Sequence, residues 1–266
     1  MRATNRSWKG LLCCRAGLTL IELLVAAALS SLLILMAVVT LGGATDAWKD
    51  SNSAADALGD GRAAMLILRR DFANRLRDTP VYVNPRVDSP DGLNSNVLAF
   101  YTALRPGARE PGVDRGNIGM VAYYRAFTPD LRGGESPKLF RVQISPQEVW
   151  RDAEAAGWDP VFSPDPIADE ASGRSELVAA NVLQFAVTGL VQGEDGEIIP
   201  VPATITSDKI EAAGIDLLLR LVESGPAARL LSADDWAGNS DVSATLFDRD
   251  GDTNDDKGVR TFRARF

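Results

Sequence analysis

A single carboxylate inside an apolar run is the most unusual chemical group in the sequence. Glu22 is the one charged residue in the 24-residue segment from Leu18 to Leu41. An ionised acid at the middle of a membrane helix costs about 2.5–3.5 kcal/mol, and less near a helix end. An acid in such a place is a functional hypothesis by default, and we expect Glu22 to meet a positively charged partner.

A second group of acids lies near the end of the chain. Acids on alternate residues of a tight loop can point several oxygens inward, which suits the 6–8 hard ligands that calcium takes. The loop is not an EF-hand, because Thr253 and Val259 stand where that motif needs glycine and glutamate. A calcium site and a solvated acidic loop with no cation both remain open. The candidate calcium ligands are Asp248, Asp250, Asp252, Asn254 and Asp256.

Composition removes most catalytic chemistry. The chain has no histidine, which excludes Ser-His-Asp and Cys-His nucleophiles and every metal site that needs imidazole. Its two cysteines, Cys13 and Cys14, are adjacent and precede the apolar run. No glycine-rich phosphate loop or G-x-S-x-G motif occurs, and a net charge of −8 argues against nucleic acid as a partner. We therefore expect a protein that is not an enzyme and has no cofactor apart from the calcium just considered.

The apolar segment must be positioned by a membrane. As a helix, 24 residues span roughly 36 Å, enough to cross a hydrocarbon core of about 30 Å. Residues 1–17 carry four basic side chains and no acid, which predicts a cytoplasmic N-terminus. We expect a single-pass protein of the inner (cytoplasmic) membrane, with residues 18–43 as the transmembrane helix and the C-terminal part outside the cytoplasm.

The residues around Glu22 resemble a known processing signal. Gly17-Leu18-Thr19-Leu20-Ile21-Glu22-Leu23-Leu24-Val25 is similar to the cleavage and methylation signal of type IV prepilins and type II secretion pseudopilins. The resemblance implies that prepilin peptidase removes the leader 1–17 after Gly17 and that Leu18, which stands where phenylalanine is usual, becomes N-methylated. It also implies that Glu22, the fifth mature residue, pairs with the N-terminus of a neighbouring subunit.

Residues 44–79 read as an amphipathic helix that continues the membrane helix. The stripe Leu58, Met65, Leu68, Phe72 and Leu76 has helical spacing, and it predicts packing against a sheet. Two glycines, Gly59 and Gly61, predict a kink. Prolines 80, 85 and 90 predict a loop that ends the helix.

Residues 80–266 read as a β-rich soluble domain. An acidic, serine- and proline-rich stretch at 152–176 predicts a surface excursion, and residues 193–196 predict a hairpin turn. In the last strand Phe262, Ala264 and Phe266 alternate with Arg263 and Arg265, as in a half-buried antiparallel strand. The expected strands are 97–101, 120–127, 139–144, 182–191, 198–205, 215–222 and 261–266.

The predicted fold class is α+β, one long N-terminal helix packed on antiparallel sheets, as the pilin resemblance also implies. The size of the soluble part and the residues at 69–71 make the chain similar to the J-type minor pseudopilin of type II secretion. Residues 69–73, 98–101 and 121–125 make it similar to the pilin-signal proteins of the Verru_Chthon cassette group.

The expected function is that of a minor pseudopilin-like subunit of a type II secretion or type IV pilus-like assembly. Its expected partners are prepilin peptidase, the membrane and other pseudopilins. The alternative is a signal-anchored envelope binding protein that never polymerises, and a tethered enzyme ranks third.

Overall fold

The chain forms one long helix and ten strands in the part that the structure describes. This computed structural model describes residues 19–77, 79, 81–86, 95–103, 117–129, 134–156, 173–193, 195, 197–201, 209–210, 214–237 and 258–266. The helices are α1 (Leu20–Ala73), α2 (Pro146–Ala156), α4 (Ser224–Ala227) and α5 (Ala233–Trp236). The strands are β1 (Val81–Arg86), β2 (Ser95–Ala103), β3 (Ile118–Pro129), β4 (Glu135–Ile144), β5 (Ser175–Ala179), β6 (Val182–Gln192), β7 (Ile198–Val201), β8 (Lys209–Ile210), β9 (Gly214–Val222) and β10 (Val259–Arg265).

Two compact units divide the chain between Lys49 and Asp50. In the first unit, every described residue from 19 to 49 is exposed. Two of its hydroxyl groups bond within the helix: Ser31 and Thr40 donate to the carbonyls of Ala27 and Met36 at 2.9 and 2.8 Å. These two hydroxyl groups therefore need no partner outside the helix.

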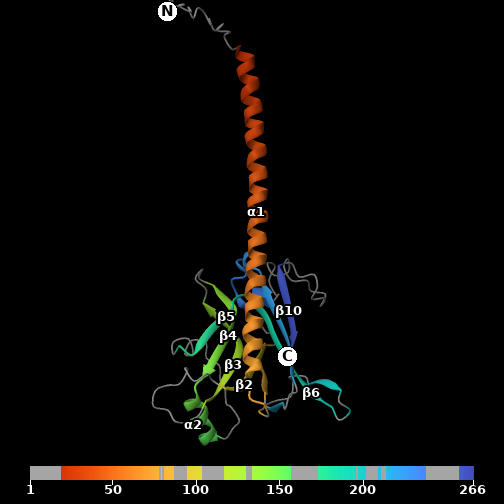
Figure 1. Ribbon diagram of the computed structural model, residues 1–266. Helices are drawn as coiled ribbons and strands as arrows, with labels where there is room; N and C mark the ends of the chain where they lie inside the picture. The colour runs from red at the N-terminus through yellow and green to blue at the C-terminus, as the bar shows by residue number, and fades with distance from the viewer. Residues whose placement is uncertain are drawn as a thin grey trace, which may run out of the picture. The chain divides into compact units, whose positions relative to one another are not determined.

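The second unit holds two antiparallel sheets (Figure 1). The six-stranded sheet has the order β5-β4-β3-β2-β1-β8, and the four-stranded sheet has the order β10-β9-β6-β7. Two side chains of the larger sheet bind the backbone of β6: Arg125 Nε donates to the Val182 carbonyl at 2.6 Å, and Asn96 Oδ1 accepts from the Val187 amide at 2.9 Å. These buried contacts fix the two sheets to each other.

The main core lies where the C-terminal part of α1 packs on both sheets. Leu68 and Phe72 of α1 belong to one cluster with inward-facing residues of β1–β5, β6 and β9. The Phe72 ring meets the Phe100 ring edge-on at 5.5 Å between centroids and lies 6.1 Å from the Phe266 ring. On the other face of the six-stranded sheet, Val149 of α2 packs on a second cluster. The predicted α+β fold, with a long N-terminal helix on antiparallel sheets, is thus confirmed.

The buried stripe of α1 differs from the expected one. Leu68 and Phe72 are buried as predicted, and Leu58, Met65 and Leu76 are half-buried. Met65 still packs against the main core, and Leu76 packs against the cluster on the other face of the six-stranded sheet. The first buried turns of α1 carry small residues instead. Small side chains let a helix approach a sheet closely. The buried residues of α1 are Ser53, Ala57, Gly61, Ala64, Leu68 and Phe72.

Gly61 shows how close this approach is. A Cβ atom at this position would overlap the ring of Phe262 in β10. The helix α1 continues without a break through Gly59 and Gly61, where the sequence predicts a kink. Gly61 therefore serves contact with the last strand.

The loop expected after the helix is partly a strand. The helix ends at Ala73, short of the expected residue 79, and β1 pairs antiparallel with β2 over its whole length. Proline removes a backbone donor, so the sequence predicts a loop, not a strand, around Pro85. It is tolerated because the described part of β8 pairs only with Val81 and Tyr82, which leaves Pro85 at an edge.

Other strands match the prediction with small shifts. The strands expected at 97–101, 120–127, 139–144, 182–191 and 215–222 are confirmed as β2, β3, β4, β6 and β9. The alternation in β10 is confirmed, because Arg263 and Arg265 are exposed while Phe262 and Ala264 are half-buried. The expected excursion at 152–176 begins within α2 and ends within β5, and residues 157–172 lie outside the described part.

Candidate functional site

Glu22 lies in the first turn of α1 and forms a capping box with Thr19. The Thr19 amide and hydroxyl both donate to Glu22 Oε2 at 3.0 Å. In return, the Glu22 amide donates to Thr19 Oγ1 at 3.3 Å. This exchange satisfies donors that the start of a helix leaves without partners. The predicted site residue is therefore held by its own helix in the isolated chain.

The second carboxylate oxygen of Glu22 has no hydrogen bond within the described residues. A carboxylate accepts at both oxygens, so Glu22 has acceptor capacity left for a further cation. Gly17 and Leu18 lie outside the described residues, and their cleavage and methylation remain predictions.

The helix surface around Glu22 is apolar on all sides. Leu20, Ile21, Leu23 and Leu24 are each more than 60% exposed in the isolated chain. The α1 helix is long and apolar enough to cross a membrane by length and composition. A helix that is apolar all round requires burial in lipid or among other helices. Glu22 is therefore a carboxylate on a helix surface that requires apolar surroundings.

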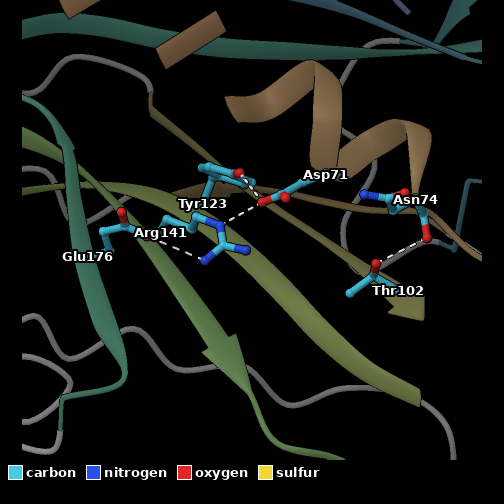
Figure 2. A network of polar contacts seen from close by, with 6 residues as sticks. All are labelled: Asp71, Asn74, Thr102, Tyr123, Arg141 and Glu176. Atoms are coloured by element: carbon cyan, nitrogen blue, oxygen red, sulfur yellow. Dashed lines mark hydrogen bonds and ion pairs between the residues drawn. The ribbon is translucent and has the colours of Figure 1, made fainter. Parts of the chain in front are cut away.

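A second polar site lies near the C-terminal end of α1, at Asp71 (Figure 2). Asp71 Oδ2 accepts hydrogen bonds from the Tyr123 hydroxyl and from Arg141 Nε, both at 2.6 Å. Arg141 also reaches Glu176 of β5 at 3.5 Å. The network joins the helix to three strands, since Tyr123 is in β3 and Arg141 in β4.

Burial determines the electrostatics of this network. Burial and the neighbouring Asp71 carboxylate raise the pKa of Tyr123 above its usual range, so the hydroxyl stays protonated and donates. Burial works against the charge on Arg141, but the hydrogen bond and charge of Asp71 outweigh it and raise the pKa of Arg141. A neutral donor and a cation on one carboxylate form a structural clamp, and no substrate-sized group is needed to explain it.

In the sequence, Asp71 stands out only as part of the segment 69–73, which resembles a motif of pilin-signal proteins. A signal existed, because an acid in the last turn of a helix opposes the helix dipole and requires a compensating cation. The partners could not be read from the sequence, since Tyr123 and Arg141 follow Asp71 by 52 and 70 residues. The backbone just past the helix is also tied to the sheet, where Thr102 Oγ1 donates to the Asn74 carbonyl at 3.0 Å (Figure 2).

The acidic loop at 248–256, with all five candidate calcium ligands, lies outside the described residues. Among the residues that are described, no group of three or more His, Cys, Asp or Glu side chains is placed to hold a metal. Calcium binding by the loop stays a prediction. A melting temperature of the chain that responds to calcium and to chelator is the measurement that checks it.

Trp236 lies in the interior of the second unit. Trp236 is 1% exposed and packs in a cluster with Leu183 and Leu230. Ser232 and Asp235 form a capping box at the start of α5, the short helix that contains Trp236. Trp236 is thus an anchor of the fold.

Comparison with known proteins identifies the N-terminal segment. Residues 13–38 match the family model of the prokaryotic N-terminal methylation motif. The match spans Gly17, Leu18 and Glu22, and it confirms the prepilin-type signal expected from these residues. No protein of curated function matches the sequence.

A type IV-like pilin from Thermus thermophilus is similar in structure, with 12% sequence identity and a TM-score of 0.33. The similarity covers 79% of this chain and 94% of that pilin. The chain thus combines a prepilin-type methylation motif with a long helix packed on antiparallel sheets.

Proposed function

We propose that this chain is a minor pseudopilin-like structural subunit of a type II secretion or type IV pilus-like assembly. Prepilin peptidase releases Leu18 as the mature N-terminus, and the apolar part of α1 holds the chain in the inner membrane and packs among equivalent helices. The work is mechanical. The observation that carries the proposal is Glu22, a carboxylate within the matched motif on an otherwise apolar helix with acceptor capacity left.

The proposed partner of Glu22 is the N-terminal amine of a neighbouring subunit. Two opposite charges about 4 Å apart gain about 4 kcal/mol at an effective dielectric constant of 20, and more where water is scarce. That gain offsets the cost of holding each charge in lipid and fixes the axial register of adjacent helices. The capping box with Thr19 orients the carboxylate before the neighbour arrives.

The first experiment reads the mature N-terminus by mass spectrometry of the chain from its native membrane. Leu18 at the N-terminus is the expected result. Met1 at the N-terminus would contradict the proposal and leave a signal-anchored binding protein that does not polymerise. Gly17→Val is expected to leave the full-length precursor, because the peptidase site requires a small residue, and Gly10→Val within the leader is the matched control.

The second experiment separates anchoring from assembly. Glu22→Ala is expected to insert and to be cleaved, because it removes a charge from an apolar helix. It should co-assemble poorly, because the neighbour's amine then has no partner. Crosslinking between subunits in membranes measures this, and Glu22→Asp serves as the conservative control. Wild-type crosslinking in Glu22→Ala would contradict the ion pair.

A further inference from the structure

The exposed face of α1 in the second unit is strongly basic. Arg62, Leu66, Arg69, Arg70 and Ala73 of α1 are all exposed, and so is Arg77, four residues past the end of the helix. The five helical residues lie on the side of α1 away from the buried stripe that contains Gly61, Leu68 and Phe72. Among the described residues, none of the four arginines makes an ion pair. We call these six residues the arginine face.

A hairpin of the smaller sheet has the opposite character. The antiparallel pair β6–β7 turns at 193–197, a segment with three acids and no base. Its described acids, Asp195 and Glu197, are exposed, and Ile198 and Ile199 are 54% and 46% exposed although they point to opposite faces of β7. We call Asp195 and residues 197–199 the acidic arm; Figure 1 shows this hairpin at the margin of the sheets.

The two surfaces match in charge and polarity. Each surface combines exposed apolar side chains with one sign of charge: Leu66 is 65% exposed on the arginine face, and Ile198 is 54% exposed on the acidic arm. Both surfaces are exposed in the same copy of the second unit, so the arm does not cover its own arginine face.

We propose that the acidic arm of one copy of this chain docks on the arginine face of another copy. Because the two surfaces differ and lie on the same chain, the contact is head-to-tail, and each copy keeps one free surface of each kind. Such a contact propagates into a row of copies instead of closing as a two-fold dimer. The inference rests on the proposed function, to which it adds a contact between the soluble parts of successive subunits.

Disulfide crosslinking of the full chain tests this contact. In a Cys13→Ser, Cys14→Ser background the chain has no other cysteine. Leu66→Cys combined with Ile198→Cys is expected to give a ladder of disulfide-linked multimers in membranes under mild oxidation. The two single variants, co-expressed, should give dimers only. Leu66→Cys with Leu177→Cys is the control, since Leu177 is equally exposed at 54% but lies in β5.

Charge exchange tests the reason for the contact. Arg70→Glu is expected to lower the crosslinking yield about fivefold, as loss of about 1 kcal/mol of ion pairing predicts. Adding Glu197→Arg should restore the yield, which also shows that both variants fold. Arg229→Glu reverses an exposed arginine outside the arginine face and should leave the yield unchanged.

A missing ladder, in a chain that is cleaved at Gly17 and depends on Glu22 for assembly, overturns the arm contact and leaves the proposed function intact. A ladder that is unaffected by Arg70→Glu overturns the charge match. Subunit contacts that depend on Arg70 but give no ladder assign the arginine face to a partner of different sequence. Retention of Met1 instead contradicts the proposed function itself.

Discussion

The two parts of α1 meet the requirement for burial in opposite ways. Residues 20–49 are exposed on all sides in the isolated chain, and their surface is apolar apart from a few positions such as Glu22. Residues 50–73 bury one narrow stripe, which starts with small side chains and ends with Leu68 and Phe72. The first part requires surroundings that the chain does not provide, whereas the second is fitted to its own sheets. One continuous helix therefore combines a general apolar surface with a specific contact.

The largest expected effect breaks the specific contact at Asp71. Asp71→Ala leaves the Arg141 charge and the Tyr123 hydroxyl without their common acceptor in a nearly buried site. Removing one partner of such a pair costs about 3–5 kcal/mol. Chemical denaturation of the full chain in detergent measures the loss. Asp56→Ala, at an exposed acid of the same helix, should change the free energy of unfolding by less than about 0.5 kcal/mol. Equal losses in the two variants would disprove the clamp.

A charge placed in the first part should affect membrane insertion and little else. Leu35→Arg is expected to weaken insertion by about 2.5–3.5 kcal/mol, because the arginine lies near the middle of the apolar segment. Leu66→Arg, at a position equally exposed in the second part, should insert like the wild-type chain. Alkaline extraction of membranes measures both. Poor insertion of Leu66→Arg would move the boundary of the membrane segment towards the sheets.

Adding one methyl group at Gly61 or at Gly59 tests how closely α1 packs on the sheets. Gly61→Ala forces the Phe262 ring to move, and overpacking of this kind costs about 1–3 kcal/mol, reduced by up to about 1 kcal/mol of helix propensity. At Gly59 a Cβ has nothing within 4 Å, so Gly59→Ala should stabilise the chain by up to about 1 kcal/mol. Opposite shifts in the denaturation midpoint are the expected result. Stabilisation by both changes would show that the Phe262 ring of β10 can move aside at little energetic cost.

The smallest expected effect concerns Asp60. Partial burial and the neighbouring Asp56 raise the pKa of Asp60. A raised folded-state pKa favours folding at low pH, and this advantage is lost as the pH rises through it. Asp60→Asn should therefore stabilise the chain by about 0.2–0.5 kcal/mol at pH 7, the size of a like-charge pair one turn apart. Denaturation curves should show the gain falling as the pH drops through the pKa of Asp60 and vanishing at about pH 3, below the ordinary aspartate pKa of about 3.9. A gain that persists there would exclude the ionisation of Asp60 as its cause.

The sequence predicts best where hydrophobicity alone decides. The apolar helix and strands such as β3, β6 and β9 follow from runs of large apolar residues, and β10 follows from its alternation. The methylation motif is local, so Glu22 could be assigned from its neighbours in the chain.

Three features could not be predicted for physical reasons. The N-terminal part of the buried stripe consists of small residues such as Ala57 and Gly61, which a search for large apolar side chains does not detect. Strand β1 contains Pro85, which is tolerated because the described part of β8 pairs only with Val81 and Tyr82. The Asp71 network depends on partners at distant positions in the sequence.

The contact between Gly61 and Phe262 also has a consequence in time. The two residues are about 200 positions apart, so Phe262 is synthesised well after Gly61. At roughly 5–20 residues per second, the helix waits about 10–40 s before β10 exists. During that interval the small-residue stripe is uncovered while the anchor is already made. A chain that stops early, or arrives truncated, keeps the stripe open and is distinguishable from a finished subunit before it joins any assembly.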